Sequence, residues 1–285
     1  MIPFDWQEPE TLEAAIALLA EGDDTVRAFS GGTALMLMMK AGVFIPSCLV
    51  SLAKIGPEHS QIALTSDGGL RIGAMASLSQ LEQARAVGEN FPVVRQALRT
   101  LSNVRVRNVA RVGGALAHGD PHMDLPPLLA SLGTIASVHG PSGRREIAVE
   151  DLYRGYYETQ LRRGELIEAV SVPPLGNAKA VYVKVTSRSA DDWPALNLGL
   201  RMQMDGGRIA AARIVVGAAT EKPTRLHETE KLLQGQRPAG SLLIEAGDRA
   251  AREVEFLSDS HGSAAYKKEL LRVYLRRAVE ECAGV

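Results

Sequence analysis

The chain has 285 residues, 46% of them hydrophobic and 23% charged, which is ordinary for a globular protein and long enough for two domains or more. Lys and Arg number 32 against 33 for Asp and Glu, so no net field favours nucleic acid or an anionic membrane, and neither is an expected partner. The sequence has no apolar run of the ~18 residues that span a membrane, and no basic segment followed by an apolar one opens it. We therefore expect a cytoplasmic protein without a membrane span.

The first predicted elements form a small βαβ unit. Apolar spacing over residues 12–19 predicts a helix, which is followed by a strand at 26–29, a helix from 33 to about 41, and a strand at 48–52. Gly31-Gly32 forms the turn between the first strand and the second helix. Glycine lets a ligand approach the main chain, and a helix N-terminus offers unpaired N–H groups at the positive end of its dipole. This turn therefore predicts a seat for a phosphate, although it matches neither G-x-x-x-x-G-K-[ST] nor G-x-G-x-x-G.

From residue 61 the pattern changes to hairpins and short helices. Glycine-containing turns join pairs of strand-like segments into hairpins, at 62–64 with 70–72 and at 134–139 with 145–149. Helical spacing recurs at three places, 77–87, 91–101 and 128–132. The alternation in Val104-Arg105-Val106 predicts a strand, and a further strand is expected at 165–172.

A second glycine pair, Gly113-Gly114, follows an apolar segment and precedes an acidic loop with two histidines. His118, Asp120, His122 and Asp124 are close enough in the sequence to suggest a metal site. Metal sites need fixed ligand geometry and ordered supporting groups, which a loop rich in Gly and Pro does not supply by itself. We therefore favour a solvated loop and predict no metal ligand.

The best candidate for a linker is the segment 173–177, Pro-Pro-Leu-Gly-Asn. Strands are expected beyond it at 180–184, 196–204 and 208–217, and then helices at 224–233, 239–254 and 264–281. Strands followed by helices are typical of an α+β domain.

With these stretches in place, the chain resembles the flavoprotein (medium) subunits of the molybdenum hydroxylases, the family of carbon monoxide dehydrogenase and xanthine dehydrogenase. The matching motifs, in the family's order, are Phe29-Ser30-Gly31-Gly32-Thr33-Ala34-Leu35, Arg107-Asn108-Val109-Ala110-Arg111-Val112-Gly113-Gly114, Pro121 with Asp124-Leu125, and Lys184 with Ser187-Arg188 and Asp191-Asp192. The resemblance implies a mixed α/β (α+β) fold with an FAD-binding domain of the PCMH type at 1–175. That domain would divide into a small βαβ subdomain at 1–55 and a larger mixed subdomain at 56–175. A smaller α+β domain, an antiparallel sheet with helices, would occupy 176–285.

The resemblance also implies FAD as the cofactor, with both glycine stretches against its pyrophosphate. Asp124 would contact the FAD, Lys184 would lie beside the isoalloxazine, and Ile167 would pack near the flavin. Arg111 stands where relatives often have threonine and is expected within reach of a phosphate, whereas Ala115 replaces a common asparagine. The cofactor-binding residues predicted in this way are Ser30, Gly31, Gly32, Thr33, Ala34, Arg111, Val112, Gly113, Gly114, Ala115, Asp124, Ile167 and Lys184; no catalytic residue is predicted.

The function implied is electron transfer within a larger complex. The chain has two cysteines, Cys48 and Cys282, so it cannot hold an iron–sulfur cluster alone. The resemblance assigns the clusters to a [2Fe–2S] small subunit and the substrate to a molybdopterin-containing large subunit, in a heterotrimer or a dimer of heterotrimers. Two alternatives stay open: a stand-alone FAD-dependent oxidoreductase, and a non-redox nucleotide-binding protein. The second is disfavoured because neither glycine stretch carries the Lys-Ser/Thr that positions Mg-bound phosphates.

Overall fold

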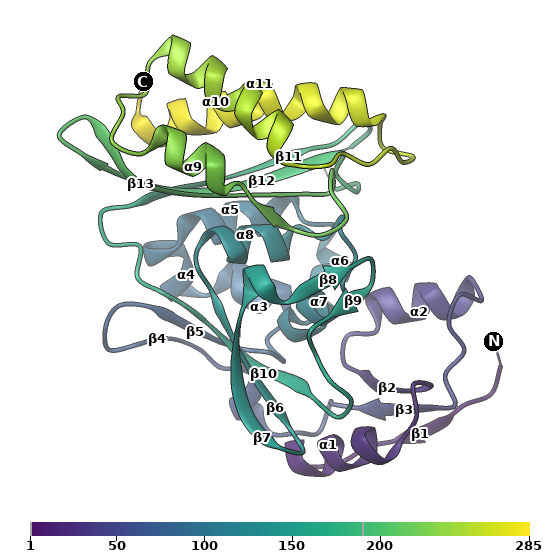
Figure 1. The fold of residues 1–285 in the computed structure, drawn as a ribbon. Helices are drawn as coiled ribbons and strands as arrows, with labels where there is room; N and C mark the ends of the chain where they lie inside the picture. The colour runs from purple at the N-terminus through teal and green to yellow at the C-terminus, as the bar shows by residue number, and fades with distance from the viewer. Residues whose placement is uncertain (1, 190) are drawn as a thin grey trace.

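The N-terminal part of the chain is the predicted βαβ unit, which is confirmed (Figure 1). The computed structural model describes residues 2–189 and 191–285. A three-stranded parallel sheet has the order β1-β3-β2. Helix α1 buries the apolar face predicted from the sequence against this sheet. The elements are β1 (Asp5–Gln7), α1 (Leu12–Glu21), β2 (Val26–Phe29), α2 (Thr33–Lys40) and β3 (Cys48–Ser51).

The middle of the chain is built on a five-stranded antiparallel sheet of order β4-β5-β10-β6-β7. Both predicted hairpins are confirmed as neighbouring strands of this sheet. A cluster of short helices packs with the sheet around the largest hydrophobic core of the chain. The strands are β4 (Ile62–Leu64), β5 (Leu70–Gly73), β6 (Ile135–Gly140), β7 (Gly143–Ala148) and β10 (Leu166–Val172), with a separate pair β8 (Tyr153–Gly155) and β9 (Glu158–Thr159). The helices are α3 (Leu78–Gln83), α4 (Arg85–Asn90), α5 (Pro92–Thr100), α6 (Val104–Val109), α7 (Val112–Ala117) and α8 (Leu125–Ser131), with 3-10 turns η1 (Pro57–Ser60) and η2 (Val149–Asp151).

Two predictions in this region are wrong. The strand expected at 104–106 is helix α6, because the Asn103 side chain accepts hydrogen bonds from the amides of Arg105 and Val106 and so caps a helix start. The helix expected over 77–87 is interrupted at Ala84, whose ψ of 127° is extended. A capping box of Ser77 and Gln80 starts α3, and beyond the interruption α3 packs against α4 and α5.

The C-terminal part is a four-stranded antiparallel sheet of order β11-β12-β13-β14 with helices on both faces. Figure 1 shows α10 and α11 on one side of it and α5 and α8 of the preceding region on the other. The predicted strands and helices are confirmed here, except that a short strand precedes the first helix. The elements are β11 (Lys179–Val185), β12 (Leu196–Asp205), β13 (Arg208–Gly217), β14 (Thr224–Arg225), α9 (His227–Leu233), α10 (Gly240–Glu253) and α11 (Ala264–Ala283). In the described part of the chain, none of the helices combines the length and the apolarity needed to cross a membrane.

Candidate functional site

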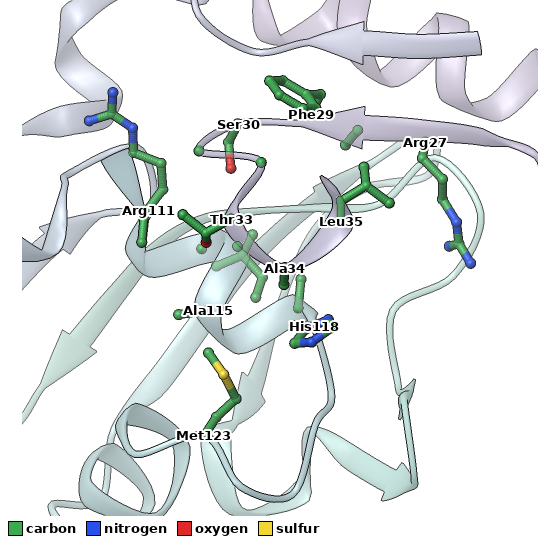
Figure 2. A pocket seen from close by; sticks show the side chains of 18 of the residues that line it. Arg27, Phe29, Ser30, Thr33, Ala34, Leu35, Arg111, Ala115, His118 and Met123 are labelled. Carbon is green, nitrogen blue, oxygen red and sulfur yellow. The ribbon is translucent and has the colours of Figure 1, made fainter. Parts of the chain in front are cut away.

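A cavity of about 640 Å³ lies between the N-terminal unit, the middle region and the edge of the C-terminal sheet. It is lined by both glycine stretches and by the loop that follows α7. Figure 2 shows Ser30, Thr33 and Ala34 from the first stretch facing Ala115 and His118 of the second. Of the predicted cofactor-binding residues, those that line the cavity are Ser30, Gly31, Gly32, Thr33, Ala34, Arg111, Gly113, Gly114, Ala115, Asp124, Ile167 and Lys184.

The first glycine stretch lines this cavity and has main-chain N–H groups without a hydrogen-bond acceptor among the described residues. Gly32 is the N-cap of α2 and has a φ of 66°, a left-handed conformation that favours glycine. Within the described residues, the amides from Gly31 to Leu35 have no hydrogen-bond acceptor, and the first amide of this turn that finds one is Met36, which donates to the Gly32 carbonyl at 2.9 Å. The first turn of α2 can therefore offer several N–H groups to an anion.

The second glycine stretch has a different geometry. Gly113 and Gly114 lie inside helix α7 and do not form a turn like the one at Gly31-Gly32. The amides of Val112 and Gly113 already donate to the carbonyls of Ala76 and Ala74, at 3.0 and 2.8 Å. The Val112 side chain is fully buried and does not line the cavity. Gly114 is exposed, and a Cβ placed there would meet only Ser30 Oγ, at 3.0 Å.

The two stretches also contact each other. A Cβ on Gly31 would lie 2.1 Å from the carbonyl oxygen of Val109, so only glycine lets the N-terminal unit approach the end of α6 this closely. Gly113 is constrained in the same way by Ala74, whose Cβ would lie 2.7 Å away. Gly31 and Gly113 are therefore needed for packing between segments of the chain, and Gly114 is the glycine that leaves the cavity open.

The opposite side of the cavity carries a buried ion pair. Lys184 Nζ donates to Asp124 Oδ2 at 3.1 Å and to the carbonyl of Thr100 at 2.8 Å, and Tyr182 Oη donates to Asp124 Oδ1 at 2.7 Å. The Lys184 and Asp124 side chains are only 5% and 8% exposed. Burial raises the pKa of Asp124, and the Lys184 ammonium and the Tyr182 hydroxyl oppose that shift. The structure thus brings together two predicted site residues that are 60 positions apart in the sequence.

The loop between α7 and α8 is not simply solvated, which corrects the expectation for its histidines. His122 Nδ1 lies 3.0 Å from Asp120 Oδ1, and His122 Nε2 lies 2.9 Å from Asp259 Oδ2. Asp259 also accepts a hydrogen bond from the fully buried Lys267. The sequence could not reveal this cluster, because Asp259 lies 137 residues after His122. Among the described residues, no group of three or more His, Cys, Asp and Glu is arranged to hold a metal ion.

Two further predicted residues, Ile167 and Arg111, both line the cavity but differ in how their side chains lie. Ile167, 7% exposed, lines it with an apolar side chain. Arg111 Nη1 donates to the Met75 carbonyl at 3.2 Å, and Figure 2 shows its guanidinium extending away from Ala115 and His118. The sequence analysis did not assign His118, Met123 or Tyr157 to the site, although they line the cavity as well.

Comparisons with known proteins agree along the whole chain. Residues 2–175 match the family model described as the FAD binding domain in molybdopterin dehydrogenase, and residues 181–282 match the CO dehydrogenase flavoprotein C-terminal domain. The carbon monoxide dehydrogenase medium chain of Afipia carboxidovorans is 32% identical over 285 residues, covering 98% of this chain and 97% of that one. The glyceraldehyde dehydrogenase medium chain of Sulfolobus acidocaldarius is 29% identical over 280 residues and 98% of both chains. In the crystal structure of a Cu,Mo-CO dehydrogenase, a chain with 30% identity matches with a TM-score of 0.94, covering 100% of this chain and 99% of that chain.

Proposed function

Because this chain belongs to the FAD-binding medium subunits of the molybdenum hydroxylases, an oxidoreductase family, we propose that it is the electron-transfer subunit of such a complex. Its cofactor is FAD. The chain would take electrons from the [2Fe–2S] clusters of a small subunit and pass them to an external acceptor. A molybdopterin-containing large subunit would bind and oxidise the substrate.

The observation that carries this proposal is the row of amides from Gly31 to Leu35, which have no acceptor among the described residues, opposite the open face of Gly114. A pyrophosphate is doubly anionic and needs several donors in a small space. Main-chain amides at a helix N-terminus supply such donors without a Lys or Arg clamp. The glycine at 114 leaves room for the ligand to approach the main chain, so the residues present fit the dinucleotide part of FAD.

The remaining predicted residues would act on the rest of the cofactor. FAD, when bound, accepts an electron pair and can release it one electron at a time. Lys184 would hold a positive charge at the C-terminal side of the cavity, where it would favour a reduced, anionic ring. Asp124 fixes the Lys184 ammonium through the 3.1 Å contact and could accept a hydrogen bond from a cofactor hydroxyl. Ile167 would exclude water from one side of the ring.

We further propose that the chain divides into domains at 1–175 and 176–285, with subdomains at 1–55 and 56–175. Separate hydrophobic clusters support this division, one on each of the three larger sheets. The alternative of a stand-alone FAD oxidoreductase is less favoured, because relatives that match almost the full length are named as medium chains or subunits of dehydrogenases and of a hydroxylase.

The test is a visible absorbance spectrum of the purified chain, followed by heat release and identification of its chromophore. We expect a flavin spectrum and released FAD, with no bleaching by small organic donors until both the iron–sulfur subunit and the molybdopterin-containing subunit are added. Bleaching of the isolated chain by such a donor would support the stand-alone alternative. A colourless chain that added FAD cannot restore would contradict the proposal.

A further inference from the structure

His122 joins the loop between α7 and α8 to the C-terminal region. Its two ring nitrogens meet Asp120 in its own loop and Asp259 in the segment before α11. Each carboxylate has a second partner: Tyr157 Oη donates to Asp120 Oδ2 at 2.8 Å, and Lys267 donates to Asp259. The cluster thus connects segments that are distant in the sequence on one border of the cavity, because His122 and Tyr157 both line it.

The same loop is fastened to the C-terminal sheet at two more points. The amide of Ala218 donates to the Pro121 carbonyl at 2.9 Å, and Asn197 Nδ2 donates to the Met123 carbonyl at 3.1 Å. Asp124, which holds Lys184, is the next residue. The position of Asp124 therefore depends on how the loop from 120 to 123 is held.

Backbone strain concentrates around this loop. In the described part of the chain, the non-glycine residues with positive φ are Ser102, Tyr157 and Ala218, at 54°, 56° and 59°. Tyr157 donates to Asp120, and Ala218 contacts Pro121 and accepts a hydrogen bond from Lys267 Nζ at 2.9 Å. Such conformations are energetically unfavourable and persist where surrounding contacts impose them, which is common at functional sites.

The charges of the cluster balance only when His122 carries a proton. Asp120 and Asp259 supply two negative charges, and Lys267 supplies one positive charge. Burial lowers the pKa of His122, but the hydrogen bonds and charges of the two carboxylates outweigh burial and raise it above its ordinary value of 6.5. Burial opposes the shift at Asp259 as well, yet Lys267 and His122 lower that pKa to about 2. The other rings that face His122 are those of His261, at 5.2 Å, and Trp193, at 5.9 Å.

We propose that protonated His122 is a positioning residue for the FAD site, which fastens the loop from 120 to 124 to the C-terminal region so that FAD is held less tightly once His122 loses its proton. The neutral ring has a single N–H, so it can donate to only one of the two carboxylates and presents a lone pair to the other. The loop then loses one of its attachments. This inference rests on the proposed function, because it assigns a role in holding FAD.

The sign of the pH dependence follows from the raised pKa. A group whose pKa is higher in the folded protein contributes stability that is fully present below its unfolded value, here 6.5. That contribution is lost as the pH rises through the folded pKa. We therefore expect the thermal stability of the FAD-free chain to fall as the pH rises above about 6.5, and the FAD affinity to fall as the pH passes the raised pKa of His122 in the folded chain.

The experiment measures the FAD dissociation constant by flavin fluorescence, and the melting temperature of the FAD-free full-length chain, between about pH 6 and about pH 9. For the wild type we expect FAD affinity to fall about ten-fold across this range, a coupling of ordinary size. His122→Gln should already bind FAD about ten-fold more weakly at the acidic end and show a nearly flat profile. His122→Arg, which keeps a planar cation that can reach both carboxylates, should restore acidic affinity without the alkaline loss. His227→Gln, at an exposed position on α9, is the matched control and should keep the wild-type profile.

A His122→Gln variant with the wild-type slope in both measurements would overturn the inference. Should that variant fail to fold, Asp259→Asn tests the same attachment and is expected to flatten the slope; an unchanged slope there would also overturn it. A wild-type chain that binds no FAD at any pH would instead overturn the proposed function. The melting profile of the FAD-free chain would then still decide whether His122 fastens the loop.

Discussion

The two sides of the cavity are built on different chemistry. The N-terminal side is lined by residues 31–35, whose main-chain amides lie at the left-handed Gly32 and the start of α2. The C-terminal side offers charged side chains that are paired, the buried Lys184 with Asp124 and the partly buried His122 with its carboxylates. An amide keeps its partial charge at any pH, whereas a buried ion pair depends on both of its members.

This difference determines whether a substitution affects ligand binding or the stability of the fold. On the N-terminal side, here called the amide side, a substitution that blocks the ligand's approach to the main chain should affect ligand binding and leave the fold almost intact. On the C-terminal side, here called the ionic side, removal of one partner leaves an uncompensated buried charge, so the folded state should become less stable. The predictions below test that contrast.

The largest effect is expected from Lys184→Met. The change leaves the Asp124 carboxylate, 8% exposed, without its cation, and breaking a buried pair in this way costs about 3–5 kcal/mol. The measurement is the free energy of unfolding of the FAD-free chain in urea. The matched control is Lys54→Met, which removes an exposed pair with Glu8 and should leave the free energy of unfolding nearly unchanged.

The double variant Lys184→Met with Asp124→Asn separates charge from packing. It removes both charges, so most of the lost stability should return. Equal losses for Lys184→Met and Lys54→Met would show that the ionic side does not behave as a buried pair.

A smaller effect, confined to ligand binding, is expected from Gly114→Val. The new Cβ meets only Ser30 Oγ within the protein, at 3.0 Å, and valine suits a helix at least as well as glycine. The FAD-free chain should therefore unfold within about 1 kcal/mol of the wild type. If blocked approach removes two charge-assisted hydrogen bonds, FAD affinity should fall by more than about 100-fold.

The neighbouring glycine gives the control for that prediction. Gly113→Val places a Cβ 2.7 Å from that of Ala74 in a buried position, so it should cost about 1–3 kcal/mol of stability even without FAD. Full FAD retention by Gly114→Val would remove the second glycine stretch from the binding site.

The same contrast explains what the sequence could predict. The βαβ unit, the hairpins and the start of α2 follow from local features, namely apolar spacing and glycine turns, and these predictions are confirmed. The residues of the first glycine stretch line the cavity as expected. The turn and the start of α2 could be predicted because their sequence signals, the paired glycines and the apolar spacing, lie within ten residues of Gly32.

The predictions that failed have both local and distant causes. The alternation at 104–106 is helical because the adjacent Asn103 caps it. At the start of α7, the amides of Val112 and Gly113 donate to the carbonyls of Ala76 and Ala74, which are distant in the sequence. The loop with His122 is held by Asp259, which no local pattern connects to it. Lys184 and Asp124 were placed in the site by resemblance to the family, and their contact comes from the packing of β11 against the middle region.

Arg111 gives the smallest expected effect and sharpens the distinction between the two sides. The family resemblance predicts that Arg111 contacts a phosphate of FAD. In the structure, its guanidinium instead donates to the Met75 carbonyl and extends away from Ala115. If that orientation is kept, Arg111→Ala should cost about 1 kcal/mol of stability, the value of one hydrogen bond, and change FAD affinity less than about three-fold. The control is Arg105→Ala, at an exposed position on α6.

A loss of about 30-fold or more in FAD affinity for Arg111→Ala would mean that Arg111 turns to a phosphate when FAD binds, because only a charge-assisted hydrogen bond to the ligand is worth that much. The amide side would then also rely on a charge.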